Sequence, residues 1–350
     1  MRYIIIGAGA IGGTVGAYMV RAGHDVLFVD NVKEHVDKIN KDGLKIVGRE
    51  EFTIHAPAVL PEQLDTELRG DPPEAILLCT KAQHTREALK PIIPYLNDKS
   101  YVVSMQNGLL EYIIADMIGE KRTVGSFVNF SADYHGPGLI MYGGLGAMYI
   151  GELNGQMSQR VLELTEVMRT SFLDNSTATD NIFGYLWGKM GYASQLFATA
   201  VVDETMADVY AMTKYRHVLA NLAGEVVMVA DAKGIKCYGF NGYNPDAYRF
   251  SNPRNWEAIN ESLDKLEAFN RVNLKTKSGI WRDLAVRKRR TEVDYQVNAV
   301  VKQGEDLGLK LPLNKLLVDI IHDLESGKRI MEIANLEDLY ELDRKTYPTD

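Results

Sequence analysis

One lysine stands in an otherwise apolar stretch of the sequence, and its position suggests acid–base chemistry. Residues 185–202 (YLWGKMGYASQLFATAVV) contain no Asp, Glu or Arg, and Lys189 is their one charged side chain. Apolar residues at spacings of three and four place Lys189 on the apolar face of a helix that starts near residue 182. An ammonium group there either extends to the edge of that face or lies in a cleft. Partial burial in a cleft would lower its pKa and let it exchange protons near neutral pH.

The same stretch is long enough to be considered as a membrane span, but its composition argues against one. It includes Gly188, Gly191 and Gln195 beside the lysine. A lysine at the centre of a span costs roughly 2.5–3.5 kcal/mol even on insertion scales. The apolar run at the N-terminus is too short for a signal peptide. We therefore expect a cytoplasmic protein that does not enter a membrane.

A glycine-rich motif follows the short apolar run at residues 3–6 and precedes a helical pattern. Its residues are Gly7, Ala8, Gly9, Ala10, Ile11 and Gly12. In such a motif the first glycine makes a tight turn, and the second lets the backbone approach a pyrophosphate. The third allows close packing of helix and strand, and the helix N-terminus faces the phosphates. The order strand, glycine turn, helix and strand predicts a dinucleotide-binding site.

Asp30 ends the second predicted strand, residues 26–29, and bears on the choice of cofactor. A carboxylate at this position accepts hydrogen bonds from a ribose 2′-hydroxyl and repels a 2′-phosphate. The first cation after it is Lys33. The alternative is that Asp30 only caps the following turn. The sequence favours NAD over NADP.

Two further predicted strands end in polar residues that could bind ligands. Residues 75–79 are followed by Thr80 and Lys81, and residues 101–105 by Gln106 and Asn107. Ligands of open α/β sheets sit beyond the carboxyl ends of the strands. We therefore expect Lys81 and Asn107 near the nicotinamide and the substrate, although Lys81 alone could equally be a surface lysine.

The alternation of strands and helices predicts an α/β fold for the first half of the chain, and a chain of 350 residues normally forms two domains. Residues 171–181 are polar and rich in turn formers, as in a linker. The segments that follow with helical patterns are 216–233, 255–276, 280–307 and 316–324. The expected organisation is a Rossmann-type dinucleotide-binding domain (1–178), an all-α catalytic domain (179–340) and a tail (341–350).

Composition excludes several other classes of protein. The formal net charge of −8 argues against a nucleic-acid partner, which would require a clustered positive face. The basic run at 287–290 is typical of a solvated helix end. Cys79 and Cys237 lie far apart and give neither a disulfide framework nor a metal pattern, so no metal is expected. The only argument for a homodimer is that symmetric dimers are common among soluble proteins.

Over nearly its whole length the chain resembles the ketopantoate reductases (2-dehydropantoate 2-reductases). The shared motifs are GAGAIG at 7–12, TKAQ at 80–83, QNG at 106–108, PGLIMYGGLGAMYIGE at 137–152, LWGKM at 186–190, RRTEVDY at 289–295 and GLKLPLNKLL at 308–317. The resemblance implies that Lys189 is the general acid, Glu292 a substrate-binding or catalytic carboxylate, and Asn107 a positioning residue. An ammonium can stabilise and protonate the alkoxide that forms when a ketone accepts hydride. By spacing alone, Glu292 could instead be a helix-surface acid paired with nearby arginines.

The chain departs from the family pattern at several positions. Ala193 and Phe197 stand where the family has substrate-binding asparagines, one and two turns after the lysine. Ser278 is the nearest counterpart of a substrate serine, and the alignment there needs an extra residue. An aromatic insertion at 237–250 could form a pocket wall or an ordered loop, and Asp30 replaces a basic residue that selects NADP. We therefore expect a small 2-oxo or 2-hydroxy acid, or a related secondary alcohol, with ketopantoate itself in question.

Two other functions stay open at this point. A β-hydroxyacid dehydrogenase also pairs such a sheet with a helical domain and a catalytic lysine, but it is not expected to carry TEVDY near its C-terminus. A non-catalytic NAD sensor would bind cofactor without any turnover that depends on Lys189.

Overall fold

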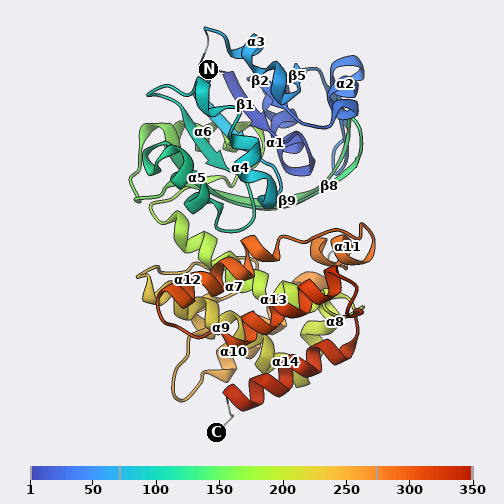
Figure 1. Ribbon diagram of the computed structural model, residues 1–350, viewed down its shortest axis with the longest axis vertical. Helices are drawn as coiled ribbons and strands as arrows, with labels where there is room; N and C mark the ends of the chain where they lie inside the picture. Colours follow the sequence, from blue (N-terminus) through green and yellow to red (C-terminus); the bar gives the residue numbers. More distant parts are fainter. Residues whose placement is uncertain (1, 71, 273–274, 348–350) are drawn as a thin grey trace. The chain divides into compact units, whose positions relative to one another are not determined.

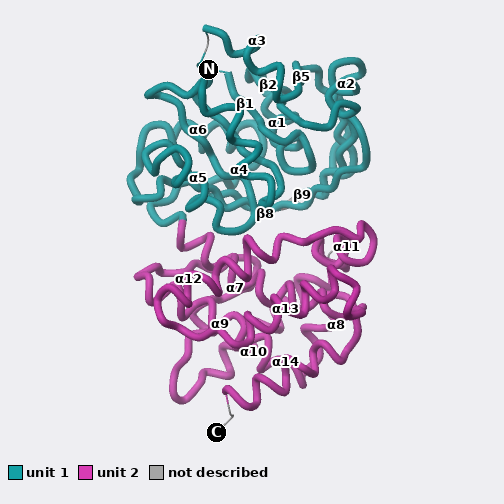
Figure 2. Tube along the Cα trace, in the orientation of Figure 1, with its two compact units in different colours: residues 1–182 teal, residues 183–350 magenta. Residues whose placement is uncertain are grey.

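The computed structural model describes residues 2–70, 72–272 and 275–347. The chain divides into two compact units, residues 1–182 (unit 1) and 183–350 (unit 2), which Figure 2 distinguishes by colour. Figure 1 labels their helices and strands.

Unit 1 is built on a mixed sheet that has ten strands within the described residues. The path is β4-β3-β9-β8-β7-β6-β1-β2-β5, and β10 pairs with β9. Strands β8, β7, β6, β1, β2 and β5 pair in parallel, whereas β8 and β9 form a long antiparallel hairpin. The strands are β1 Arg2–Ile6, β2 Asp25–Val29, β3 Leu44–Gly48, β4 Phe52–Ile54, β5 Ala58–Val59, β6 Ala75–Leu78, β7 Tyr101–Ser104, β8 Thr123–Gly136, β9 Leu139–Glu152 and β10 Thr177–Ala178.

The central strands are continuous apolar runs because the sheet is buried on both sides. Ile5, Phe28 and Leu77 belong to one core cluster together with Val15 and Val161 from two helices. The predicted strands at 3–6, 26–29, 75–79 and 101–105 and the α/β fold class are confirmed. The helices of unit 1 are α1 Ala10–Arg21, α2 Lys33–Asp42, α3 Leu64–Leu68, α4 Thr85–Leu89, α5 Leu110–Ile118 and α6 Gln159–Ser171.

The polar segment 171–181 is not only a linker. It contains β10, in which Thr177 and Ala178 pair in parallel with Tyr149 and Ile150. This pairing uses backbone groups, so the polar side chains of the segment gave no sign of it.

Apart from one isolated bridge, the regular secondary structure in the described residues of unit 2 is helical, which confirms the predicted helical second half. Its core gathers large apolar side chains such as Phe197, Leu219, Leu263 and Leu317. The helices are α7 Ile182–Thr199, α8 Met206–Ala211, α9 Arg216–Ala232, α10 Trp256–Arg271, α11 Gly279–Ala285, α12 Val297–Asp306, α13 Pro312–Glu325 and α14 Ile333–Thr346. Residues 341–346, which the sequence assigned to a tail, belong to α14.

The long helix predicted over 280–307 is interrupted, and the basic run lies in the interruption. After α11 the chain folds back, and the guanidinium groups of Arg287 and Arg289 lie 3.0 and 2.9 Å from the carboxylate of Asp283. Asp283 is buried. The four residues of the run are exposed just after the end of α11, as expected for a solvated helix end, and two of the arginines also pair with this buried acid.

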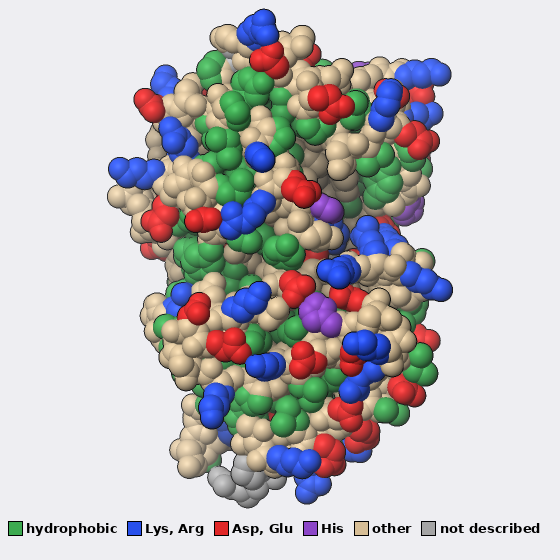
Figure 3. Space-filling model, viewed as in Figure 1, with side chains coloured by type: hydrophobic (Ala, Val, Ile, Leu, Met, Phe, Trp, Pro, Cys, Tyr) green, Lys and Arg blue, Asp and Glu red, His purple; other side chains and the backbone are tan. Residues whose placement is uncertain are grey.

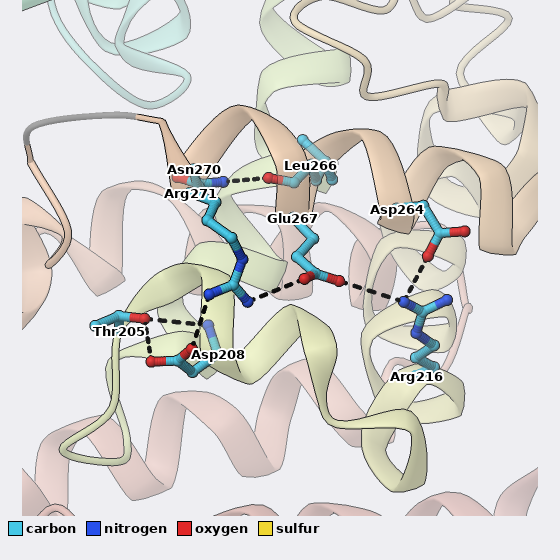
Figure 4. A network of polar contacts seen from close by, with 8 residues as sticks. All are labelled: Thr205, Asp208, Arg216, Asp264, Leu266, Glu267, Asn270 and Arg271. Carbon is cyan, nitrogen blue, oxygen red and sulfur yellow. Dashed lines mark hydrogen bonds and ion pairs between the residues drawn. The ribbon is translucent and has the colours of Figure 1, made fainter.

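A network of polar contacts ties α8, α9 and α10 together (Figure 4). Arg271 of α10 binds Glu267 at 2.9 Å and Asp208 of α8 at 3.3 Å. Arg216 of α9 binds Asp264 at 2.6 Å, and Thr205 caps α8 by accepting the Asp208 N–H. Exposed pairs of this kind contribute under about 1 kcal/mol each. Their main effect is to fix the relative positions of three helices that support α7.

Within the described ranges, no helix is long and apolar enough to cross a membrane, α7 included. On the face of the molecule in Figure 3, basic and acidic side chains are interspersed rather than gathered by sign. That face offers no positive patch for a polyanion.

Candidate active site

The glycine turn after β1 has the geometry that a pyrophosphate requires. Gly7 has φ +93°, which favours glycine. A β-carbon at Gly12 would overlap the Gly7 carbonyl oxygen and lie 2.8 Å from Cβ of Cys79, so this position must be bare. Around Gly9, by contrast, no described atom lies within 4 Å of where a β-carbon would be. The turn is therefore closed on its inner side and open over Gly9.

The open side of this turn leads to the N-terminus of α1. Gly9 caps this helix without a side chain, and the Gly13 N–H donates to the Gly9 carbonyl at 2.8 Å. The N–H groups of a first helical turn have no acceptor within the helix, and the helix dipole is positive there. Ala10, Ile11 and Gly12 supply these groups. The residues present fit the phosphates of a dinucleotide.

Asp30 accepts two backbone hydrogen bonds at the end of β2. One carboxylate oxygen accepts the Ala8 N–H at 2.8 Å, and the other accepts the Val32 N–H at 2.9 Å. The second bond is the turn cap that the sequence left as an alternative, and the first ties β2 to the glycine turn. Each carboxylate oxygen can accept a further bond, so capping leaves acceptor capacity for a ribose hydroxyl. Lys33, the first cation after Asp30, pairs with Asp37 at 2.6 Å.

His35, on α2, is a site residue that the sequence analysis missed. It is buried, and its Nδ1 accepts the Gly138 N–H at 2.9 Å. Nε2 must then carry the proton, and it donates to the Ala8 carbonyl at 2.9 Å. His35 thus holds the glycine turn from one side while Asp30 holds it from the other. The only indication in the sequence was its position on the apolar face of the helix with Val36 and Ile39, and this position does not show which groups it binds.

The predicted ligand-binding residues of β6 and β7 lie at the same edge of the sheet as the glycine turn. Lys81 and Asn107 are exposed there. Buried Gln106 links their two loops by donating to the carbonyl of Thr80 and the hydroxyl of Thr85, both at 2.9 Å.

Strand order then fixes the order of these groups along the edge. Because β7, β6, β1 and β2 are neighbours, Asn107, Lys81, Gly7 and Asp30 follow one another. Strands lie ~4.8 Å apart, so the two ends of this row are roughly 14 Å apart. A dinucleotide with its adenine ribose at Asp30 would extend its nicotinamide toward Lys81 and Asn107.

Lys189 lies on the partly exposed stripe of α7. Tyr185, Lys189, Tyr192 and Leu196 all keep some exposure, and they recur at spacings of four, three and four residues. Tyr192 turns its hydroxyl inward, where burial raises its pKa to about 12 against the opposing effect of a hydrogen bond with Asn270. Lys189 is therefore the one charged side chain of this stripe.

The positions of the missing asparagines have different surroundings. Ala193 is nearly buried, whereas Phe197 is completely buried in the apolar core of unit 2. Ser194, beside Ala193, donates to the amide oxygen of Asn314 on α13 and so anchors α7. An asparagine at 197 would meet the core, so Phe197 is a packing residue in this chain.

Glu292 is buried just before the 3₁₀ turn Val293–Tyr295, so it is not a helix-surface acid. Both flanks of Glu292 are held by α13. The N–H and hydroxyl of Thr291 donate to Glu325, each at 2.7 Å. His322 lies 3.1 Å from Glu325 and 3.2 Å from Asp294. Burial alone would lower the pKa of His322, but the two carboxylates outweigh it and raise that pKa.

Ser278 is buried at the start of α11, where its hydroxyl accepts the Trp281 N–H at 3.1 Å. This is the geometry of an N-cap. The bond gives the side chain a structural role that needs no substrate.

Comparison with known proteins shows the family to which the chain belongs. The family model described as "Ketopantoate reductase PanE/ApbA" matches residues 3–155, and its C-terminal counterpart matches residues 181–325. The chain belongs to the ketopantoate reductase family. A 2-dehydropantoate 2-reductase of Pyrococcus horikoshii is 29% identical over 328 residues, covering 93% of this chain and 98% of that protein. One from Streptococcus pyogenes serotype M1 is 24% identical with the same coverage.

Solved structures share the fold. A D-mandelate dehydrogenase in a ternary structure with NADH and anilino(oxo)acetate has a TM-score of 0.79 at 22% identity, covering 94% of this chain and 100% of that one. A PanE/ApbA family ketopantoate reductase from Ralstonia eutropha JMP134 has a TM-score of 0.77 at 21% identity, covering 94% and 99%.

Membership of the ketopantoate reductase family makes this chain an oxidoreductase that acts on CH–OH groups with a nicotinamide cofactor. It favours an enzyme over the NAD sensor, and this family over the β-hydroxyacid dehydrogenases.

Proposed function

We propose that this ketopantoate reductase family member uses NAD and interconverts a small 2-oxo acid and its 2-hydroxy acid. The observation that carries the proposal is Lys189, the one charged residue of the 18-residue helix α7, on its partly exposed stripe. In this proposal unit 1 binds the cofactor and unit 2 carries the acid.

The roles of the side chains follow from the charge that develops in the reaction. A bound nicotinamide supplies or accepts the hydride at C2 of the substrate. Lys189 stabilises the oxyanion at C2 and donates the proton that makes it a hydroxyl, and it accepts that proton in the reverse direction. Glu292 balances the ammonium charge and accepts a hydrogen bond from the substrate. Asn107 positions the substrate without changing the net charge, and Lys81 attracts its carboxylate.

Asp30 supports NAD as the cofactor. Its carboxylate repels a 2′-phosphate and accepts a bond from a 2′-hydroxyl, while the ammonium of Lys33 is already paired with Asp37. The test is kcat/KM for NADH against NADPH with one 2-oxo acid. We expect NADH to be preferred.

Ala193 supports a substrate other than ketopantoate, the compound named in the family's relatives. A methyl group replaces an amide there, so a polar substituent near it would lose a hydrogen bond. A panel of 2-oxo and 2-hydroxy acids, ketopantoate included, tests this with NAD, NADH, NADP and NADPH. If the enzyme turned over none of these acids, that result would contradict the proposed reaction. A cytoplasmic location and a homodimer stay predictions.

A further inference from the structure

The aromatic insertion, residues 237–250, packs directly along α7. The Tyr238 N–H donates to the Gly184 carbonyl of α7 at 2.9 Å. β-Carbons at Gly188 and Gly191 would overlap the Tyr238 carbonyl oxygen and the Tyr243 hydroxyl. Glycines on both sides of Lys189 therefore create the space that the insertion occupies.

The contact brings two tyrosine rings together one helical turn before Lys189. The ring centroids of Tyr185 and Tyr238 are 4.9 Å apart, with the planes inclined at 44°. On the insertion side, the Lys236 ammonium lies 5.9 Å from the centroid of Tyr238. Residues four apart on a helix have their β-carbons roughly 5–6 Å apart. The ring pair thus flanks the position of the proposed proton donor.

Two other rings of the insertion are anchored in the core, and a third packs farther along α7. Tyr243 and Tyr248 are buried and stacked at 5.2 Å. Phe240 packs against Tyr192, with centroids 5.4 Å apart, and both rings are partly exposed. Tyr185 and Tyr238 also keep part of their surface exposed. The insertion therefore places one partly exposed ring pair before Lys189 and another after it, and only the Tyr185–Tyr238 pair lies on the N-terminal side of the lysine.

We infer that Tyr185 and Tyr238 form the wall of the substrate pocket that receives the substituent on C2, and that this substituent is an aromatic ring. The inference rests on the proposed function, because it takes Lys189 as the group that faces the C2 oxygen. A ring attached to C2 then reaches the tyrosine pair, where tilted aromatic contacts are favourable. On the other side of Lys189, the methyl group of Ala193 offers no hydrogen bond to a polar substituent.

The test compares phenylglyoxylate, a 2-oxo acid with a phenyl substituent, with 2-oxobutanoate, which carries an ethyl group. For wild type we expect the higher kcat/KM with phenylglyoxylate. Tyr185→Ala and Tyr238→Ala should each reduce the ratio of the two kcat/KM values by about 10- to 100-fold, the range for losing one large apolar contact. Tyr238→Phe should keep the ratio, since the ring rather than the hydroxyl makes the contact.

Phe240→Ala is the matched control, because it removes a partly exposed ring of the same insertion that packs against Tyr192, after Lys189, rather than against Tyr185, before it. It should leave the ratio within about threefold of wild type, well below the effect of losing a pocket contact. Thermal melting of every variant shows whether it is folded. A ratio that is unchanged in folded Tyr185→Ala and Tyr238→Ala would overturn the inference.

A binding measurement separates failure of the inference from failure of the proposed function. Calorimetry measures the affinity of the NADH-saturated enzyme for phenylglyoxylate, and it detects a contact with the tyrosine pair even if no turnover occurs. Binding that weakens in Tyr185→Ala but not in Phe240→Ala supports the wall, even if no 2-oxo acid is reduced and the proposed reaction is wrong. Equal binding by wild type and Tyr185→Ala, or none by wild type, overturns the wall.

Discussion

Lys189 combines an ammonium group with a position among apolar side chains, and this makes its loss a sharp test. Lys189→Met keeps the stem, so folding and NAD binding should survive. Turnover should fall by roughly 10²- to 10⁴-fold, the usual contribution of a positioned acid or base. Steady-state kcat on the best 2-oxo acid measures this. The control is Lys315→Met, which removes an exposed ammonium from α13. Activity of the Lys189 variant within about threefold of wild type would exclude this residue as the acid.

Asp30 holds the glycine turn and is also the proposed partner of the ribose, so the informative substitution removes its charge but keeps one oxygen. In Asp30→Asn the amide oxygen can still accept one of the two backbone N–H groups. We expect the preference for NADH over NADPH to fall by about tenfold or more, because apposed like charges cost several kcal/mol. The measurement is kcat/KM with both cofactors. A wild-type enzyme that prefers NADPH would show that Asp30 serves only as a cap.

Ala193 lies one turn after Lys189, and under the proposed function an amide at this position would reach a substrate hydroxyl. Ala193→Asn should raise kcat/KM for ketopantoate, relative to the best panel substrate, by the equivalent of about 1–2 kcal/mol, the size of one buried hydrogen bond. If wild type already reduces ketopantoate best, another residue supplies that contact and the argument from Ala193 is wrong.

The positions of single residues were predictable where a local motif fixes them, as for the glycines of the turn and for Asp30 at the end of β2. His35 was not, because its partners, Ala8 and Gly138, lie 27 and 103 residues away in the sequence. A lone histidine on an apolar helix face carries no record of such contacts.

Among the elements, strands buried on both faces were predictable because a short apolar run between turn residues is typical of them. The interruption between α11 and α12 was not, because the helical pattern continues across it. In the interruption the chain folds back, and Arg287 and Arg289 pair with Asp283. The insertion was recognisable by its aromatic residues, but its docking on α7 depends on Gly188 and Gly191, which by themselves resemble weak points in a helix.

The docking of the insertion on α7 can be tested through one of these glycines. In Gly188→Ala the methyl group would overlap the Tyr238 carbonyl, so the insertion must shift. We expect the free energy of unfolding to fall by about 1–3 kcal/mol, as for other overpacked sites. Urea unfolding measures the change. Gly279→Ala is the control, since no described atom lies within 4 Å of its β-carbon position. Equal stability of the two variants would mean that the insertion does not pack as described.

Stability of the whole chain should depend on pH through Asp343, a buried residue of α14. Burial raises its pKa to about 6, although a hydrogen bond from Asn221 and the charge of Arg254 oppose the shift. The native state therefore holds this proton more tightly than the unfolded state, whose carboxyl titrates near 3.9. The contribution of Asp343 to stability is therefore most favourable below the unfolded pKa, falls as pH rises from about 4 to 6, and stays lower above that.

Asp343→Asn removes this titration and keeps an acceptor for Asn221. The variant should be more stable than wild type at pH 7 by up to about 3 kcal/mol, and the difference should vanish near pH 4. Denaturant unfolding of both proteins across this range measures it. A difference that does not change with pH would show that the carboxyl is not responsible.

The glycine turn has a consequence for how the cofactor arrives. Asp30 and His35 hold the N–H and the carbonyl of Ala8 from opposite sides, so both backbone groups at the centre of the turn are occupied before any ligand is present. A loop fixed in this way has little conformational freedom left to lose when a dinucleotide binds. The turn should therefore bind phosphate with little change in its own backbone conformation, and any conformational adjustment would occur in other parts of the protein.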